Sequence, residues 1–525
     1  MNDGQQVGFV LDLGRCVGCG ACVLACRLES AGRHRRSPKS PALRRVLPLN
    51  DTRHSGGPTW FLSVACHHCE RPACVRRCPS GAYERRADGV VLHHEALCVG
   101  CRYCEMACPF GAPRFDPAAG IMAKCDFCEA RATHGDEPAC VVACPTEALR
   151  LRGSGPNSPN TDLHDASVIG ELSPDPLVFI PGFLDAAACR PATRFKLPHG
   201  VRGHRLHEFM AVQAGPKPCP TNSQQGRTRD QGPGTRDQFH EWPLVVFTAL
   251  AIPAAGVFAA QSLAGIAGAA VMPTYAVWAL AATALVAGLA SSLAHLGRPL
   301  RAPLALRRAG RNALGTEVAL ASALIIIVVP ALLASFSPPL RLALARAAGV
   351  LALGLLAALG FVYFLPARWP WRTLLATTSM TSGLAIGAMV VSASGAWWWS
   401  AAAVGLLLLD TVAFAATWLS GPRFGLASPP YLPVYPGIHA RRRPLVALRV
   451  LLVDLLPATL LLAQLPALAA GITIVGIFVD RFAFFGLACV ASTEAAIADM
   501  ERAIWQCGLA MAEASPTFPT FLRPR

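Results

Sequence analysis

Sixteen of the twenty cysteines lie before residue 145, in four groups of four. The groups are Cys16, Cys19, Cys22 and Cys26; Cys66, Cys69, Cys74 and Cys78; Cys98, Cys101, Cys104 and Cys108; and Cys125, Cys128, Cys140 and Cys144. The first and third groups have the spacing C-x2-C-x2-C-x3-C, in which three thiolates bind one 4Fe–4S cluster and the fourth reaches a second cluster. Sixteen thiolates therefore predict four 4Fe–4S clusters, which together form a path for single electrons.

Two other uses of cysteine fit this pattern less well. A zinc site takes two pairs of ligands around an intervening finger rather than runs of four. Disulfides need an oxidising compartment, and the N-terminal residues contain neither a secretory signal nor a twin-arginine export signal. The four remaining cysteines are expected to be ordinary thiols: Cys189, Cys219, Cys489 and Cys507.

The elements that position these groups belong to two halves of unlike composition. Apolar residues form 53% of the 525-residue chain and charged residues 15%, whereas an ordinary soluble domain carries about 25% charged residues. This composition excludes a soluble globular protein and a disordered one. We predict an α+β, ferredoxin-like iron–sulfur domain over residues 1–150, with a tandem arrangement of clusters. An extension and flexible linker follow over 151–240, an all-α membrane domain over 241–490 and a tail over 491–525.

Eight apolar runs in the second half are long enough to cross a hydrocarbon core of about 30 Å. They are 242–265, 273–296, 314–336, 342–365, 373–394, 396–419, 445–465 and 468–490. A soluble helical bundle would need polar faces, which these runs lack. We therefore predict eight transmembrane helices.

Arginines are unequally divided between the loops of this predicted membrane domain. With eight spans, both ends of the chain lie on one side, and eleven arginines lie in loops on that side: Arg298, Arg301, Arg307, Arg308, Arg311, Arg368, Arg372, Arg423, Arg441, Arg442 and Arg443. The opposite loops hold only Arg341 and Arg346. The positive-inside rule predicts an inner-membrane protein with a cytoplasmic iron–sulfur half. The net charge of +15 thus indicates membrane topology rather than nucleic-acid binding.

Residues 1–150 resemble the four-cluster ferredoxin-like subunit of the DMSO reductase family of molybdenum enzymes. Residues 240–490 resemble the membrane anchor subunit of the same family. The second resemblance rests on HEWPL at 240–244, on SSLAHLGRPLRAPLALRRAGRNALGTE at 291–317 and, more weakly, on Asp480-Arg481-Phe482. The two subunits are commonly separate in the family, so this chain resembles a fusion.

The resemblance implies how the cysteine groups pair. It gives four sets, which we name by their first member: the Cys16 set (Cys16, Cys19, Cys22, Cys144), the Cys26 set (Cys26, Cys125, Cys128, Cys140), the Cys66 set (Cys66, Cys69, Cys74, Cys108) and the Cys78 set (Cys78, Cys98, Cys101, Cys104). The Cys78 set would lie nearest the membrane. Related nitrate reductase subunits have tryptophan at the position of Cys101 and a three-iron cluster, so Cys101 implies four irons here.

The resemblance also implies a quinone site at the end of the second span. The counterpart of His295 is implicated in quinol binding, and a histidine can hydrogen-bond a quinone oxygen and transfer its proton near neutral pH. The alternative is an interfacial histidine without such a role. Arg298 and Arg301 can orient a quinone headgroup or lipid phosphates.

Three acids are predicted inside the spans: Asp410, Asp454 and Asp480, the last beside Arg481. Intramembrane acids are costly and usually face the interior of a helix bundle. They form either interhelical hydrogen bonds and ion pairs or a proton path to the quinone site.

Taken together, the resemblance implies an electron-transfer and anchoring subunit rather than the substrate-converting enzyme. It would link a quinone pool, either menaquinone or ubiquinone, to a separate molybdopterin-containing catalytic subunit. That partner would be of the DMSO reductase type, taking electrons from quinol, or of the sulfite dehydrogenase type, delivering them to quinone. A cytoplasmic iron–sulfur half fits the sulfite type better. The alternative from another class is a transporter or ion pump with a ferredoxin redox sensor.

Overall fold

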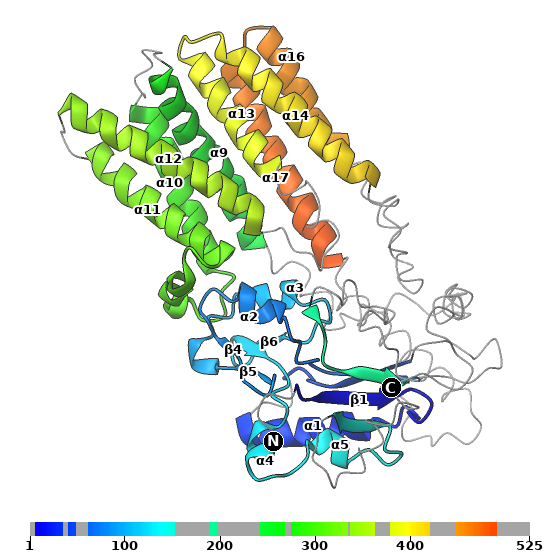
Figure 1. Cartoon of the computed structure of the whole chain (residues 1–525). Coiled ribbons are helices and arrows are strands. Elements are labelled where there is room, and N and C mark those ends of the chain that lie inside the picture. The colour runs from blue at the N-terminus through cyan, green and yellow to red at the C-terminus, as the bar shows by residue number, and fades with distance from the viewer. Residues whose placement is uncertain are drawn as a thin grey trace, which may run out of the picture.

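The computed structural model describes residues 6–34, 40–48, 61–152, 189–196, 242–267, 275–333, 337–362, 378–420 and 447–490. The predicted tail over 491–525 and most of the predicted linker lie outside these residues. The described residues form an iron–sulfur domain of short strands and helices and a second domain of long helices (Figure 1).

In its described residues, the iron–sulfur domain is built from four small sheets. The largest has the order β8 (Leu149–Arg152), β1 (Gly8–Asp12), β9 (Arg194–Lys196), with β1 antiparallel to β8 and parallel to β9. Three antiparallel pairs complete the strands: β2 (Arg45–Pro48) with β3 (Phe61–Val64), β4 (Tyr83–Arg85) with β5 (Val91–His93), and β6 (Arg114–Asp116) with β7 (Ile121–Ala123). Because β9 pairs with β1, the iron–sulfur domain reaches beyond the predicted boundary at residue 150.

Short helices carry many of the cysteines between these strands. They are α1 (Ala21–His34), α2 (Ala73–Arg77), η2 (Glu95–Leu97), α3 (Tyr103–Ala107), α4 (Glu129–Thr133) and α5 (Ala139–Val142). The core of the domain consists of apolar side chains such as Phe9, Leu11 and Leu62 together with the cysteines themselves. Elements this short bury little apolar surface, so the cysteine sites form a large part of the interior.

Each of the eight predicted spans contains helix in its described residues. The helices are α9 (Trp242–Ile266), α10 (Tyr275–Leu293), α11 (Ala313–Leu333), α12 (Pro338–Val362), α13 (Thr378–Ala393), α14 (Trp399–Ser420), η8 (Val450–Leu455) with α16 (Leu456–Leu462), and α17 (Pro466–Val490). Among the described residues four helices are long and apolar enough to cross a membrane: Trp242–Ile266, Tyr275–Leu293, Ala313–Leu333 and Pro339–Val362. A second group, Thr378–Ala393 and Trp399–Ala415, is apolar but shorter.

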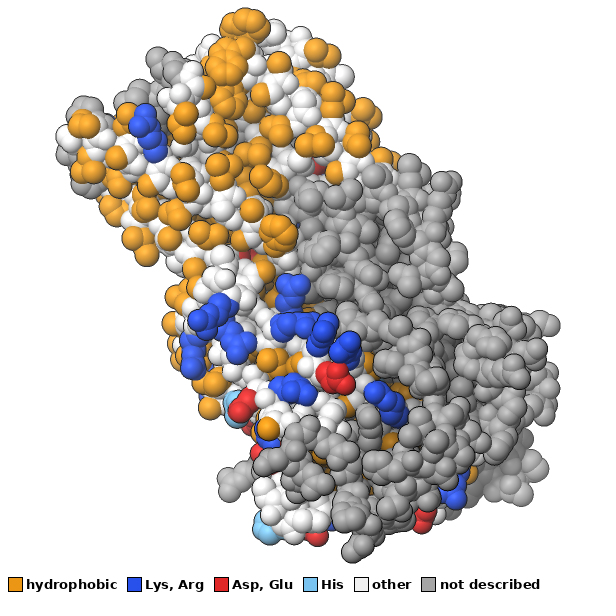
Figure 2. Space-filling model, viewed as in Figure 1, with side chains coloured by type: hydrophobic (Ala, Val, Ile, Leu, Met, Phe, Trp, Pro, Cys, Tyr) orange, Lys and Arg blue, Asp and Glu red, His pale blue; other side chains and the backbone are white. Residues whose placement is uncertain are grey.

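Helix α9 lies at the centre of the helical domain. It packs against α10, α12, α13 and α17, and 89% of its most apolar window is buried. Helix α13 approaches it most closely at Gly256, where an added Cβ would lie 1.8 Å from the carbonyl oxygen of Gly383. Small residues that allow two backbones to touch are typical of helix contacts in membranes. Figure 2 shows hydrophobic side chains over the visible face of the helices.

Candidate functional site

Three cavities in the iron–sulfur domain are each lined by four predicted ligands. The first is lined by Cys16, Cys19, Cys22 and Cys144. The second is lined by Cys26, Cys125, Cys128 and Cys140. The third is lined by Cys66, Cys69, Cys74 and Cys108. These memberships are those of the Cys16, Cys26 and Cys66 sets.

The four thiols of the Cys78 set also lie close together. Cys78 and Cys98 each contribute to the electrostatic environment of Cys101 and Cys104. Cys78, Cys98 and Cys104 are buried in one apolar cluster with Tyr83. The fold therefore places each cysteine of the sequence motif next to the three partners that the resemblance implies.

The surroundings of the sulfur atoms fit iron–sulfur ligands. Backbone N–H groups of Ala82, Met122 and Phe127 donate hydrogen bonds to the Sγ atoms of Cys78, Cys98 and Cys125, at 3.2, 3.5 and 3.4 Å. The Tyr83 hydroxyl lies 3.2 Å from the Sγ of Cys104. Hydrogen bonds to sulfur are among the features that set cluster reduction potentials. Within the described residues, no three His, Cys, Asp or Glu side chains converge on a site for a single metal ion.

Burial sets the protonation of groups in this domain. It raises the pKa of the Cys26 thiol to about 11 and that of the Cys108 thiol to about 12. Burial, together with the nearby Arg44 charge, lowers the pKa of His67 to about 3, so this imidazole is neutral. Thiols as weakly acidic as these ionise near neutral pH only when a metal stabilises the thiolate.

One cysteine that the sequence assigned no role also lines a cavity. Cys189 is buried beside the Cys66 set and interacts with Cys69. Its segment is held by backbone hydrogen bonds from Arg71 N to Cys189 O (3.0 Å) and from Ala192 N to His67 O (2.9 Å). A lone cysteine far from the motif carries no spacing signal, so the position of Cys189 beside the Cys66 set was not predicted.

The two domains meet along a seam formed by residues 75–76, 95–100, 119–120 and 297–312. Gly297 N donates to Gly100 O at 3.3 Å, and Arg298 N donates to Val99 O at 3.1 Å. An added Cβ at Gly297 would lie 2.1 Å from Gly120 O, so only glycine fits this contact. The HLGRP segment therefore lies directly on the loop between Cys98 and Cys101.

Arginine side chains extend the seam. The Arg298 guanidinium donates twice to Ala119 O, at 3.1 and 2.9 Å. Arg301 Nη1 donates to Glu95 O at 2.9 Å and to Cys98 O at 3.1 Å. Further along η5 (Pro299–Arg308), Arg308 Nη1 donates to Val75 O at 2.8 Å. Arg298 and Arg301, predicted to orient a quinone headgroup or lipid phosphates, instead contact the backbone of the iron–sulfur domain, as Arg308 does. The sequence did not predict this docking role.

His295 lies two residues before Gly297, just after the end of α10. Its side chain is half-buried, and Nδ1 contacts Ser292 O.

A second group near the seam, Glu317 at the start of α11, is 1% exposed, and its Oε2 has no hydrogen-bond partner among the described residues. Glu317 contributes to the electrostatic environment of Tyr103, two residues after Cys101. Sequence reasoning did not select Glu317 because it stands at a helix start, where acids are common.

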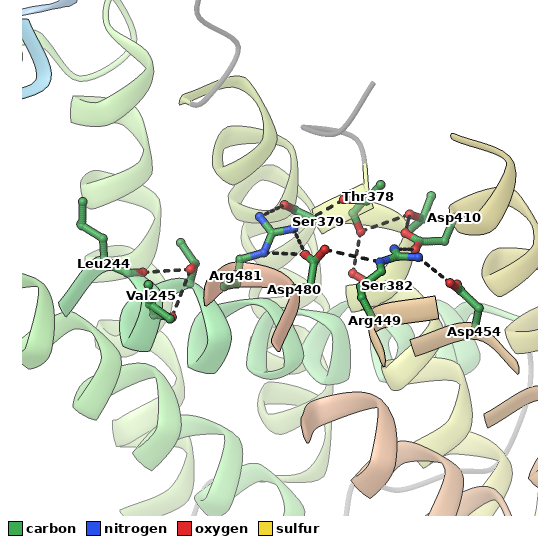
Figure 3. A network of polar contacts seen from close by, with 12 residues as sticks. Leu244, Val245, Thr378, Ser379, Ser382, Asp410, Arg449, Asp454, Asp480 and Arg481 are labelled. Atoms are coloured by element: carbon green, nitrogen blue, oxygen red, sulfur yellow. Dashed lines mark hydrogen bonds and ion pairs between the residues drawn. The ribbon is translucent and has the colours of Figure 1, made fainter. Parts of the chain in front are cut away.

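The three acids that were predicted inside the spans form one buried network with two arginines (Figure 3). Arg449 contacts Asp410 and Asp454 and lies 3.4 Å from Asp480. Asp480 pairs with Arg481, whose Nη1 lies 3.0 Å from Ser379 Oγ. Three carboxylates and two guanidinium groups leave one negative charge, and Asp454 Oδ1 has no hydrogen-bond partner among the described residues. The arginine at 449 was not anticipated from the sequence.

An apolar cluster joins this network to the seam. It contains Tyr103 and Met106 of α3 together with Leu244, Val362 and Phe414 from three helices. The Arg449 guanidinium lies over the Phe414 ring, 4.1 Å from its centroid. The apolar cluster therefore reaches from the helix that follows Cys101 to the Phe414 ring beneath Arg449.

Comparisons with known proteins agree with both halves. A family model described as a 4Fe-4S dicluster domain matches residues 58–153, and one described as the DMSO reductase anchor subunit matches residues 236–392. An anaerobic dimethyl sulfoxide reductase subunit of Escherichia coli K12 is 41% identical over 152 residues, which cover 27% of this chain and 72% of that protein. A sulfite dehydrogenase subunit of Allochromatium vinosum is 37% identical over 177 residues, covering 30% and 70%. The thiosulfate reductase electron transfer subunit PhsB of Salmonella typhi is 38% identical over 153 residues, covering 28% and 76%.

Proposed function

Because this protein belongs to the family of iron–sulfur subunits of dimethyl sulfoxide reductase-type enzymes, we propose that it relays electrons between a membrane quinone and a separate molybdopterin-containing catalytic subunit. In this chain the iron–sulfur subunit is fused to the matching membrane anchor. The observation that carries the proposal is the seam, where the segment after α10 is hydrogen-bonded to the loop of the Cys78 set. A quinone bound there would lie beside the cysteine set nearest the membrane. The family does not favour the alternative of a transporter with a redox sensor.

The four cysteine sets would each hold one 4Fe–4S cluster. Each cluster, when bound, supplies a group that takes up and releases one electron. The chain holds the sulfur ligands in fixed positions, donates backbone hydrogen bonds to them and buries most of them from water. The three cavities and the close grouping of the Cys78 set support this assignment.

Residues on the membrane side of the seam would handle the quinone and its protons. His295 would hydrogen-bond a quinone oxygen, and the buried Glu317 would accept or return a proton. Asp410, Asp454 and Asp480 would hold a further proton in the ionic network, since their single excess negative charge is unpaired inside the helical domain. The apolar cluster between the seam and the network excludes water from the space around Tyr103.

We also propose that all eight helical segments span the inner membrane and that the iron–sulfur domain lies in the cytoplasm. The starts of α9 and α11 and the end of α12 contact α3 through one apolar cluster. Helices that cross a membrane in alternating directions place these three ends on the same side. Lysine and arginine side chains gather where the helices meet the iron–sulfur domain (Figure 2). This distribution favours the cytoplasm on that side. A cytoplasmic placement favours a partner of the sulfite dehydrogenase type, which would deliver electrons to quinone.

The test is the reduction of the clusters in purified full-length protein by the quinol analogue menadiol. We expect His295→Ala to retain its iron and visible absorption but to be reduced at least tenfold more slowly, because the quinol loses its hydrogen-bond partner next to the Cys78 set. The matched control is His134→Ala, which removes an exposed histidine elsewhere in the iron–sulfur domain. Reduction of His295→Ala at the wild-type rate would remove His295 from the quinone site.

A further inference from the structure

Arg44 is a buried cation with no carboxylate partner among the described residues. Its side chain is 2% exposed, and no ion pair to an acid is found for it among the described residues. Nη1 donates to Ser63 Oγ at 3.0 Å, and the guanidinium lies 4.6 Å from the centroid of the Phe9 ring. The Nε and Nη2 atoms have no hydrogen-bond partner within the part of the chain that the structure describes. A buried guanidinium in this state is costly unless a neighbouring anion compensates its charge.

The groups around Arg44 belong to two different cluster cavities. Arg44 lines the cavity of the Cys26 set. It reaches the Cys16 set through Ser63, whose Oγ lies 3.4 Å from the Sγ of Cys22. Thiols of both sets, on Cys22, Cys26, Cys125 and Cys140, contribute to the electrostatic environment of its guanidinium. Arg44 therefore lies between two successive cluster sites.

A second buried cation occupies the next position along the same path. Lys124 is 3% exposed and lines the cavity of the Cys66 set. Its Nζ donates to Cys125 O, a carbonyl of the Cys26 set, at 2.6 Å, and to Val91 O. The order of cavities and cations is thus the Cys16 set, Arg44, the Cys26 set, Lys124 and the Cys66 set.

Such cations have a defined effect on an iron–sulfur centre. A cluster with four thiolate ligands is an anion in both of its usual states, and it becomes one charge more negative on reduction. A fixed positive charge nearby stabilises the reduced state more than the oxidised state and so raises the reduction potential. Burial strengthens the effect, because little water screens the charge.

We propose that Arg44 and Lys124 raise the reduction potentials of the clusters on either side of them. These clusters can then accept electrons from their neighbours along the path through the iron–sulfur domain. The inference rests on the four-cluster assignment of the proposed function. Arg44 would act on the Cys16 and Cys26 clusters, and Lys124 on the Cys26 and Cys66 clusters. The unpaired Nε and Nη2 atoms of Arg44 would have the anionic clusters as their compensating charge.

The experiment is a redox titration of the purified full chain monitored by EPR, preceded by an iron determination. Wild-type protein must contain about sixteen irons per chain. A lower iron content in the wild-type protein counts against the proposed function, not against the role of Arg44. We expect Arg44→Gln to lower the ratio of reduced to oxidised cluster at least tenfold at a fixed potential, equivalent to about 59 mV for one electron. Two clusters should shift and two should not.

The controls separate charge from structure. Arg44→Lys retains the charge and should keep potentials close to wild type. Arg27→Gln removes an exposed arginine next to Cys26, where water screens the charge, and should change nothing. If Arg44→Gln fails to load iron, the Lys124→Gln variant tests the proposal instead. We expect it to lower the reduction potentials of the Cys26 and Cys66 clusters. Unchanged potentials in an iron-replete variant, or loss of iron in both glutamine variants, would overturn the proposal.

Discussion

In the proposed assignment, the thiol of Cys101 determines how many irons the site formed by the Cys78 set can hold. A cubane needs four ligands, and Cys101 is the member of the Cys78 set that lies in the loop contacted by Gly297. We expect Cys101→Ala to convert that cluster to a three-iron form, detected as a new EPR signal in oxidised protein, and to slow reduction by menadiol. Cys189→Ala, which removes a fifth thiol from the Cys66 cavity, is the matched control and should retain all irons. Absence of the three-iron signal would contradict the ligand assignment.

Residues were predictable from the sequence where local spacing dictates their chemistry. The cysteines of the first and third groups reach a common centre through turns within a few residues, so their pattern is visible without the fold. Arg44, Cys189 and Glu317 gain their significance from segments distant in the sequence. A single arginine or glutamate has no spacing signal, and only burial distinguishes it from solvent-exposed residues of the same type.

At the scale of elements, the contact between α9 and α13 should be sensitive to single methyl groups. Gly256→Val would force the two backbones apart, since even a Cβ would lie 1.8 Å from Gly383 O. We expect a loss of at least about 1–3 kcal/mol in stability, measured as a lower Tm of the purified protein in detergent. Gly405→Val on α14 is the control, because nothing lies within 4 Å of its added Cβ. An equal Tm for both variants would contradict the packing.

The ionic network makes a separate prediction. Arg449→Gln would leave Asp410, Asp454 and Asp480 buried without their shared cation, which should cost about 3–5 kcal/mol. Asp454→Asn removes the excess negative charge and should leave the Tm close to wild type. The rate of quinol oxidation in Asp454→Asn then separates the two functions of the network. A slower rate at unchanged Tm indicates proton transfer, whereas an unchanged rate indicates a purely structural network.

The positions of the long apolar helices were predictable because long apolar runs have few alternatives. The described helices begin and end within a few residues of the predicted spans. Two features were not visible in the sequence. The π-helix η8 lies in the seventh predicted span, where Arg449 and Asp454 meet across one turn. The η5 helix folds the arginine-rich loop onto the iron–sulfur domain. Both depend on tertiary partners rather than on local propensity.

At the scale of the whole molecule, the seam could not be predicted from either half alone. Backbone carbonyls of residues 75–76, 95–98 and 119 accept hydrogen bonds from arginine and asparagine side chains of residues 298–312. Backbone acceptors carry no sequence signal. The HLGRP segment was recognised through its family, whereas its function as the contact between the two domains follows from the structure.

The opposite end of the molecule should bind the catalytic subunit. Helices α1, α4 and α5 lie at the end of the iron–sulfur domain farthest from the membrane helices (Figure 1). Leu24 and Leu28 form an exposed apolar pair on α1, at 60% and 67% exposure, and Val142 on α5 is 63% exposed. Exposed apolar surface of this kind indicates an interaction site. Cys19 of the Cys16 set is exposed at the start of this region, so electrons could leave the chain there.

We therefore expect Leu24→Asp to abolish copurification of the molybdopterin-containing subunit, because a buried interface would have to accommodate an unpaired charge. Reduction of the clusters by menadiol should continue at the wild-type rate, since the seam lies at the other end of the electron path. Ala87→Asp introduces the same charge at the exposed turn between β4 and β5 and should leave the complex intact. If Leu24→Asp still copurifies with its partner in full amount, the catalytic subunit must dock elsewhere, and the Cys16 set would lose its position as the exit of the electron path.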